Sequence, residues 1–495
     1  MVPEILQALL TALTDPMALG LSVIGVLLGI VLGALPGVSS TMSLAVLLPM
    51  SFTMSPMHGM MFLMGIFSAS VYGGSISAIL VNIPGTPGAI ITQMDGYPMA
   101  RKGRAGEALT YALLASTFGG LLGWLMLVML APIVADAALY FQSPEYAAVT
   151  FFGLTMLAYA TPGSTFKALI GGVIGLILAT VGLDEVTGVA RFDFGIADLQ
   201  GGITIIPVAV GIFGMAEVFR NIESSSANFE VVKNIRRLIP PWREIRALWP
   251  VAIRGSIIGA LVGAIPAAGS AIGVTVAYAQ EKRMSKNPER YGTGIPEDIV
   301  SPESANNACV GGALVPMMTL GIPGDSMTAV LIGALLIHGL RPGPQLFVER
   351  LDFVAVVYVA LLLAILLTLF FGMLGIRAFA RILYAPKNVL MTAVAMLCVV
   401  GSYAVRNSIF DVLVMIGAGA IGYLMQRVKM PVAPVVFGLI LGPLLEENVR
   451  RSLIVNGDWW VFVTRPISLS LLIISVAALI YPALRDRLKS RRQAQ

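Results

Sequence analysis

Charged residues are scarce in this sequence. They make up 12% of its 495 residues, whereas an ordinary soluble domain carries about 25%. Hydrophobic residues make up 57% and the mean hydropathy is +0.87, which excludes a soluble enzyme and indicates lipid as the main solvent. We count about twelve apolar segments that approach or reach the roughly 20 residues of a membrane-spanning helix. The clearest lie at residues 19–35, 112–134, 168–181, 353–374 and 467–480. The predicted fold class is therefore an all-α membrane protein.

Several chemical signatures are also missing. The chain has no glycine-rich phosphate-binding loop ending in Gly-Lys-Ser or Gly-Lys-Thr, so transport driven by its own ATP hydrolysis is disfavoured. His58 and His338 lack a His or Cys partner at metal-ligand spacing, which argues against a catalytic zinc. Cys309 and Cys398 lie in apolar surroundings, where a thiol behaves as a small hydrophobe. No cofactor is expected beyond a coupling cation.

The basic residues are few and grouped. The formal net charge of +5 does not indicate a nucleic-acid partner, because these residues cluster in short connections beside apolar segments, as the positive-inside rule describes. Residues 1–17 contain no Lys or Arg, so they are not a cleavable signal peptide, and the N-terminus is expected in the periplasm. The C-terminus is expected in the cytoplasm with the basic clusters, which are Arg101, Lys102 and Arg104; residues 220–254; and residues 485–492.

The sequence contains an internal repeat. GALPGVSS at residues 33–40 is answered by GAIPAAGS at 263–270, and GGSISAILVNIPG at 73–85 by GGALVPMMTLGIPG at 311–324. Two shorter matches follow in the same order: Met156-Leu157 with Met396-Leu397, and Pro207 and Gly211 with Pro434 and Gly438. Ordered matches of this kind indicate a duplication.

The repeat divides the chain into two halves. Residues 1–220 form the first half and 250–450 the second, and the polar stretch 221–249 reads as a cytoplasmic link. Residues 451–495 would add a last helix and a basic tail. If the N-terminus is periplasmic and the link cytoplasmic, the second half enters the membrane from the opposite side. The halves are therefore predicted to be inverted repeats, a recurrent plan of secondary transporters.

Glycine and proline interrupt the apolar segments at four places, in two matched pairs. Such breaks free backbone groups that lipid cannot satisfy, so they must line protein or water. We expect the four breaks to meet near the middle of the membrane. The candidate binding residues at and near the breaks are Pro36, Gly37, Ser39, Ser40, Thr41, Asn82, Pro84, Gly85, Thr86, Pro87, Gly88, Gly269, Ser270, Asn306, Asn307, Pro323, Gly324, Asp325, Ser326 and Thr328.

The breaks offer the groups that an anion and a cation need. Half-helix N-termini present free N–H donors and a positive dipole end to an anion, while unwound carbonyls and hydroxyls coordinate a cation. No Lys or Arg falls inside a break, so a bound anion would depend on dipoles, hydroxyls and a co-bound cation. The alternative is that Gly and Pro here only permit kinks and close helix packing.

Asp325 is the most distinctive candidate. A carboxylate within an apolar hairpin is costly unless it is paired, and a sodium ion would pair with it. Helix capping alone would also explain an Asp in this position. Asn306 and Asn307 offer amide groups to a ligand, although hydrogen bonds between helices are the alternative.

A set of ordered motifs gives the chain a family resemblance. The motifs are GALPGVSS, YGGSISAILVNIPGTPGA, DGYPMARKGRAGEAL, PESANNACVGGALVPMMTLGIPGDSMTAVLIGAL and HGLRPGPQLF. Together they resemble the large membrane subunit of tripartite tricarboxylate transporters over nearly the whole chain. The two copies differ where Gly37 answers to Ala267 and Thr86-Pro87 to Asp325-Ser326, so an asymmetric binding site is expected.

The resemblance implies a function and partners. It implies a cation-driven, typically sodium-coupled, importer of citrate or other di- and tricarboxylates in the bacterial inner membrane. The implied partners are a small four-helix membrane subunit and a periplasmic solute-binding protein. An elevator movement is favoured over a rocking of the halves.

Two other function classes remain open from the sequence. A passive anion channel would lack an alternating site and would run without a sodium gradient. An intramembrane aspartyl protease would need a second intramembrane aspartate facing Asp325, and no convincing partner is visible.

Overall fold

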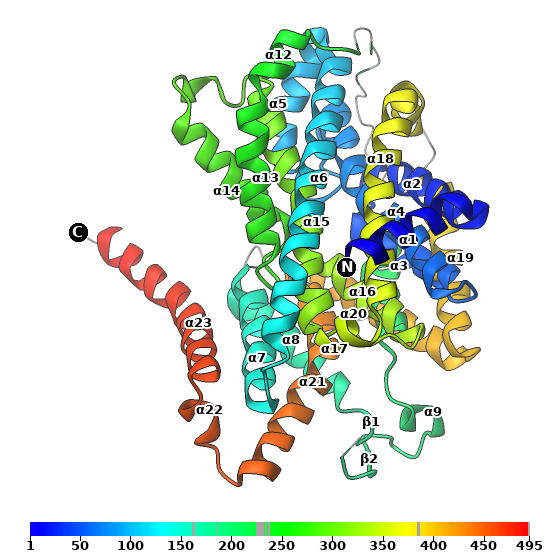
Figure 1. Cartoon of the computed structure of the whole chain (residues 1–495), viewed down its shortest axis with the longest axis vertical. Coiled ribbons are helices and arrows are strands. Elements are labelled where there is room, and N and C mark those ends of the chain that lie inside the picture. The colour runs from blue at the N-terminus through cyan, green and yellow to red at the C-terminus, as the bar shows by residue number, and fades with distance from the viewer. Residues whose placement is uncertain are drawn as a thin grey trace.

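The protein is built almost entirely of helices (Figure 1). The computed structural model describes residues 1–160, 164–184, 186–223, 232, 235, 238–383 and 387–493. Within these ranges the one sheet is a two-stranded antiparallel ribbon. The all-α prediction is confirmed. Much of the predicted link, including residues 224–231 and the basic positions Lys233, Arg236 and Arg237, lies outside the described residues.

The first half begins at α1 and ends at α11. Its elements are α1 (Val2–Thr14), α2 (Pro16–Ala34), α3 (Ser40–Leu47), η1 (Leu48–Ser51), α4 (Pro56–Val81), η2 (Pro87–Ala89), α5 (Thr92–Met99), η3 (Ala100–Arg104), α6 (Ala105–Ala138), α7 (Ser143–Ala160), α8 (Thr165–Ala179), β1 (Gly182–Leu183), β2 (Ala190–Arg191), α9 (Ala197–Gln200), α10 (Ile205–Ala209), η4 (Val210–Met215) and α11 (Ala216–Glu223).

The second half begins at α12 and ends at α21. Its elements are α12 (Trp242–Ala247), α13 (Trp249–Gly263), α14 (Gly269–Met284), η5 (Pro288–Arg290), α15 (Glu297–Leu320), α16 (Ser326–Ile337), α17 (Pro344–Glu349), α18 (Leu351–Ile382), α19 (Lys387–Arg406), α20 (Ile409–Arg427) and α21 (Ala433–Asn456). The chain then continues through α22 (Val461–Thr464) and α23 (Pro466–Gln493), which packs against α7.

Seven helices in the described ranges are long and apolar enough to cross a membrane. Shorter apolar helices, such as Trp249–Gly263 and Ser326–Ile337, accompany them because the glycine and proline breaks cut the apolar runs. A multi-pass membrane protein is therefore supported. The predicted number of about twelve membrane-spanning segments stays a prediction. The inversion of the two halves also stays a prediction.

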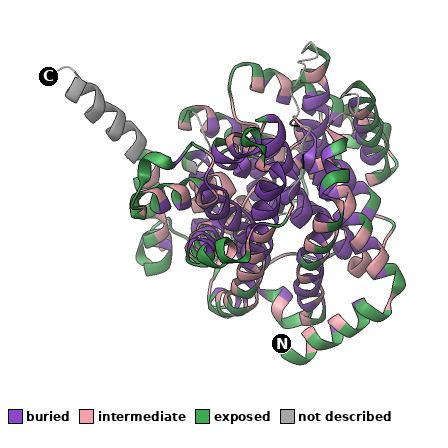
Figure 2. Cartoon of the chain, turned by 90° about the horizontal axis from the view of Figure 1, so that it is seen from above, coloured by how far each residue is buried: buried purple, intermediate pink, exposed green. Residues whose placement is uncertain are grey.

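Two helices, α4 and α15, form the centre of the molecule. In α4 every residue from Gly59 to Val81 is buried, and in α15 every residue from Asp298 to Thr319. A helix that is shielded on all sides belongs to a core, and Figure 2 shows the buried residues concentrated in the middle of the bundle. Each central helix also packs against a long helix of the other half, α4 against α18 and α15 against α6.

Glycines bring the helices of each half into backbone contact. Gly25, Gly29 and Gly33 face α4 along one side of α2, and Gly255, Gly259 and Gly263 face α15 along one side of α13. A methyl group at Gly33 would lie 2.3 Å from the carbonyl oxygen of Ser70, and one at Gly259 would lie 2.1 Å from that of Ala305. Small residues at helical spacing permit this close approach in membrane helix pairs.

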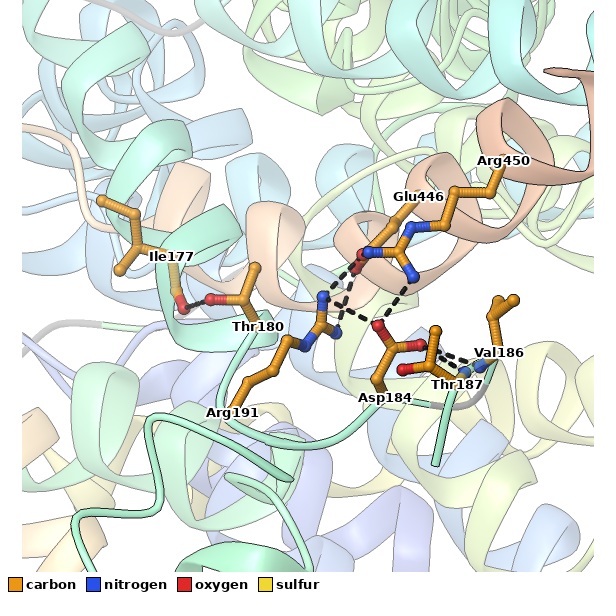
Figure 3. A network of polar contacts seen from close by, with 8 residues as sticks. All are labelled: Ile177, Thr180, Asp184, Val186, Thr187, Arg191, Glu446 and Arg450. Carbon is orange, nitrogen blue, oxygen red and sulfur yellow. Dashed lines mark hydrogen bonds and ion pairs between the residues drawn. The ribbon is translucent and has the colours of Figure 1, made fainter. Parts of the chain in front are cut away.

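An ion-pair network fastens the connection between α8 and α10 to helix α21 (Figure 3). Arg191 Nη1 donates to Glu446 Oε1 at 2.6 Å, and Arg450 Nη1 donates to Asp184 Oδ2 at 2.6 Å. Arg450 also pairs with Glu446 one helical turn away. The hydrogen bond from Arg450 holds the pKa of the Asp184 carboxyl well below its usual range.

Candidate functional site

The two breaks in the first half have the expected irregular backbone. Helix α2 ends at Ala34, and Gly37 then adopts a left-handed conformation with φ 87°. Ser39 caps α3, because its hydroxyl accepts a hydrogen bond from the Met42 N–H at 3.1 Å. Helix α4 ends at Val81, and its C-cap residue Asn82 is also left-handed with φ 58°. A short 3₁₀ turn, η2, separates this end from α5.

The two breaks in the second half repeat this geometry. Between α13 and α14, Ala267 adopts φ 63° at the position that answers to Gly37. Helix α15 ends at Leu320, and its C-cap residue Gly321 has φ 70°, like Asn82 after α4. The next helix, α16, begins at Ser326. All four predicted breaks are therefore present in the structure.

One cavity brings residues of all four breaks together. Its volume is about 160 Å³, close to the roughly 150 Å³ of an engineered cavity that admits benzene, so a small organic anion fits. Nine of the predicted residues line it: Ser40, Thr41, Thr86, Pro87, Gly269, Ser270, Asn306, Asp325 and Ser326. The four breaks thus meet at one cavity, whereas its position near the middle of the membrane and its binding of a ligand stay predictions.

Three helices begin at this cavity. Ser40, Gly269 and Ser326 are the first residues of α3, α14 and α16, and each lines the cavity wall. The first turn of a helix has unbonded backbone N–H groups and carries the positive end of the helix dipole. The convergence of three N-termini therefore makes the cavity attractive to an anion.

Several buried polar atoms at the cavity lack a partner in the protein. They are the hydroxyl oxygens of Ser40 and Thr86 and both amide atoms of Asn306. These side chains are between 1% and 5% exposed, so bulk water does not satisfy them. Because buried polar groups are nearly always hydrogen-bonded, this cluster indicates a site for a polar ligand.

Asp325 is the charged residue on the cavity wall, which in the described part of the chain contains no Lys or Arg. Its Oδ1 accepts a hydrogen bond from the Thr328 N–H at 2.8 Å, and Thr328 Oγ1 accepts one from the Asp325 N–H at 2.8 Å. This reciprocal pair is a capping box for α16. Capping is thus a property of the structure, and sodium binding stays a prediction.

The remaining predicted residues support the cavity without lining it. Asn307 turns away and donates from Nδ2 to the backbone oxygen of Glu303 at 3.1 Å. A methyl group at Gly88 would lie 2.0 Å from Asn306 Oδ1, so Gly88 makes room for that amide. Thr328 completes the capping box. The others lie within the breaks but outside the cavity wall: Pro36, Gly37, Ser39, Asn82, Pro84, Gly85, Pro323 and Gly324.

The structure adds residues that the sequence analysis missed. Leu157 of α7 and Phe437 of α21 form part of the wall, together with Val71 of α4. Leu157 lies in one of the short repeat matches and Phe437 lies beside Gly438 in another, which was the available signal. Glu303, one turn before Asn306, is also buried behind the cavity.

This fold and this cavity define a multi-pass membrane transport protein. The chain belongs to the tripartite tricarboxylate transporter TctA family, whose sequence profile matches residues 19–437. It is a member of a transporter family and not an enzyme, and the resemblance found in the sequence is confirmed.

Two proteins of Agrobacterium vitis are similar to this chain. One, described as an uncharacterized 52.8 kDa protein in the TAR-I ttuC' 3' region, is 40% identical over 487 residues, which cover 97% of this chain and 96% of that protein. The other, described as an uncharacterized protein in the TAR-II ttuC' 3' region, is 36% identical over 237 residues, which cover 46% of this chain and 96% of that protein.

Proposed function

We propose that this chain is the large permease subunit of a binding-protein-dependent secondary transporter that imports di- or tricarboxylates, driven by a cation gradient, most simply sodium. The observation that carries the proposal is the cavity, where three helix N-termini and unpartnered polar atoms converge. The N-termini suit the negative charge of a carboxylate. The hydroxyl and amide groups suit its oxygens.

The charge balance of the cavity supports cation coupling. A multivalent anion at this site would face the Asp325 carboxylate, and no Lys or Arg side chain on the described wall would offset the repulsion. A co-bound cation would neutralise both charges, because oppositely charged groups a few ångströms apart stabilise each other in a low-dielectric site. Binding of anion and cation would then be mutually dependent.

The paired breaks support alternating access. Apart from Asn306 of α15, the predicted polar residues of the cavity come from breaks whose left-handed residues match in pairs, while Leu157 and Phe437 come from α7 and α21. We propose that the breaks move together as an elevator past these helices, in inverted halves. The working complex would contain a small four-helix membrane subunit and a periplasmic solute-binding protein, in the bacterial inner membrane.

Uptake by the reconstituted complex tests the proposal. The chain would be placed in proteoliposomes with its small subunit, and uptake of labelled citrate and other di- and tricarboxylates would be measured with and without the binding protein and a sodium gradient. We expect uptake to need both. Uptake that only follows the substrate gradient would indicate a passive channel, and tight uptake without the binding protein would contradict the tripartite assembly.

Cysteine labelling tests the orientation. Both native cysteines are buried, so an added cysteine can be labelled selectively with a membrane-impermeant reagent. Pro3→Cys should react from the periplasm, and Arg246→Cys, in α12 near the end of the link, from the cytoplasm. Labelling of both from the same side would contradict the inverted arrangement.

A further inference from the structure

Glu303 is a carboxyl group buried at the centre of the molecule. It lies in α15, one of the two central helices, and is 0% exposed. A charged carboxylate in such a place is expensive unless a cation or several strong donors accompany it. The groups that surround Glu303 therefore decide which form it takes.

All hydrogen-bond partners of the Glu303 side chain are neutral hydroxyls. Thr92 Oγ1, at the start of α5, donates to Oε1, and Ser116 Oγ, in α6, donates to Oε2 at 3.0 Å. The Ser75 hydroxyl of α4 lies near the same carboxyl, is fully buried and makes no hydrogen bond of its own. Three different helices thus direct hydroxyls at one acid.

Most of the charged groups on the helices around Glu303 are bonded to partners of their own. Tyr72 of α4 faces Glu303, and a phenol is neutral near pH 7. On the elements packed against α15, Asp95 of α5 accepts from the N–H groups of Gly292 and Ile295, Glu107 of α6 pairs with Arg104, Arg254 of α13 pairs with Glu281 of α14, and Asp325 caps α16. On α15 itself, Asp298 is also fully buried, and both of its carboxyl oxygens lack a hydrogen-bond partner. Among the described residues, no ion pair compensates Glu303.

Glu303 is directly connected to the cavity wall. On its own helix, Asn306 follows one turn later and lines the cavity. Across the contact, Thr92 follows the turn that carries Thr86 and Pro87, two further wall residues. The carboxyl therefore ties the start of α5, which follows the break after α4, to α15 beside the candidate binding site.

We propose that Glu303 is a proton-binding site of this transporter, distinct from the cavity and from Asp325. Uptake of a proton would make the acid neutral and compatible with its buried place. Its release to entering water would leave a carboxylate that needs every hydroxyl donor, and Thr92 would transmit this change to Thr86 and Pro87. The proposal deepens the transport function given above, with a proton bound in addition to the cation of the cavity.

Infrared difference spectroscopy of the purified full chain tests this without any substrate, so its outcome is independent of the proposed transport function. Spectra at mildly acidic and alkaline pH would be subtracted. We expect a carboxylic-acid carbonyl band at acidic pH that is lost in Glu303→Gln and kept in Asp325→Asn. Ser116→Ala and Thr92→Val, which each remove one donor, should shift the frequency of the band and its midpoint of titration.

Two results would overturn the proposal. One is a difference spectrum that Glu303→Gln leaves unchanged, since the acid would then neither take up nor release a proton between the two pH values. The other is a band that sodium chloride abolishes at constant ionic strength, because a sodium ion would then be the ligand of Glu303. If Glu303→Gln does not fold, the Ser116→Ala and Thr92→Val spectra decide: an unshifted band would exclude Glu303 as its source.

Discussion

The breaks after α4 and after α15 have a similar backbone geometry but different polar side chains. Both begin with a left-handed residue, Asn82 or Gly321, and both place a glycine against a preceding helix turn, Gly85 against Gly74 and Gly324 against Ala313. The second break then satisfies its own polar groups, because Asp325 caps α16. The first leaves the hydroxyl of Thr86 without a partner.

This difference assigns different tasks to the two breaks. A polar group that is satisfied within the protein fixes a local structure, whereas an unsatisfied buried group has its bonding capacity available for a ligand. Asp325 contributes charge to the cavity from a rigid cap. Thr86 and Asn306 contribute uncommitted hydrogen-bonding atoms. If the two halves arose by duplication, as the sequence predicts, the copies have kept the backbone of the break and differ in its polar side chains.

The largest expected effect tests the shared scaffold. Gly85→Ala would place a methyl group 2.5 Å from the Gly33 carbonyl oxygen, and Gly324→Ala would place one 2.6 Å from Ala313 Cα. Because backbone atoms cannot yield as side chains do, we expect each change to cost about 1–3 kcal/mol and to abolish uptake. Thermal unfolding and uptake measure this.

Gly20→Ala is the matched control for these two changes, since a methyl group there meets nothing within 4 Å. It should keep both stability and uptake. If Gly85→Ala and Gly324→Ala also unfold and transport like wild type, the two breaks do not depend on the close contacts described here.

The second prediction tests the divergence. Asp325→Asn keeps the size and part of the capping capacity but removes the charge, so we expect the apparent sodium affinity to fall by about 10–150-fold, equivalent to roughly 1.5–3 kcal/mol. Thr86→Ala, at the matched position, should change it less. Uptake against sodium concentration at equal membrane abundance measures both. An Asp325→Asn curve that superimposes on wild type would leave Asp325 as a cap alone.

A third, smaller effect tests a position where one copy keeps glycine and the other does not. Both positions have a left-handed backbone, with φ 63° at Ala267 and φ 87° at Gly37. Glycine adopts this conformation readily, whereas alanine does not. A left-handed backbone costs a non-glycine residue roughly 1–2 kcal/mol. We therefore expect Ala267→Gly to raise the thermal midpoint and Gly37→Ala to lower it. Equal and same-signed shifts would show that the two positions are not equivalent.

The smallest effect concerns a region in which every charged group is paired, in contrast to the cavity. It is the network of Asp184, Arg191, Glu446 and Arg450, whose charges pair with one another. Because Arg450 lowers the pKa of Asp184 in the folded protein, the carboxyl stays ionised there while it would protonate in the unfolded chain. Its stabilising contribution is therefore present above the ordinary aspartate pKa and is lost as the pH falls through the lowered value.

We thus expect protection of residues 182–202 from limited proteolysis to be constant between neutral and mildly acidic pH. Asp184→Asn should weaken this protection at every pH in that range. Glu447→Gln, in the exposed pair with Arg451, serves as the control and should have little effect. Protection that falls steadily with mild acidification would contradict the assigned pKa direction.

The positions of the breaks could be predicted from the sequence, because proline and glycine together in an apolar run interrupt a membrane helix. Which residues line the cavity could not be derived from the sequence in this way. Asn306 and Asn307 are neighbours, yet a helix turns by about 100° between them, and only Asn306 lines the wall. The orientation of α15 that makes this choice depends on its contacts with α6 and α13.

The apolar wall was harder still to predict. Leu157 and Phe437 have no chemical signature, and they come from helices far from the breaks in the sequence. Glu303 did carry a signal, since an acid within a membrane segment is a functional candidate by default. The pattern of glycine and proline breaks does not single it out, because Glu303 lies inside α15 and outside all four breaks.

The glycine contacts between α2 and α4 and between α13 and α15 have a mechanical consequence. Side chains between two helices act as compliant spacers, and their rotamers let the helices rotate or slide a little. Here carbonyl oxygens rest on glycine Cα atoms, and close-packed backbones leave no such compliance. Each helix pair should therefore move as one rigid unit. Bending during transport would then be concentrated in the non-helical residues at the breaks, which would act as hinges.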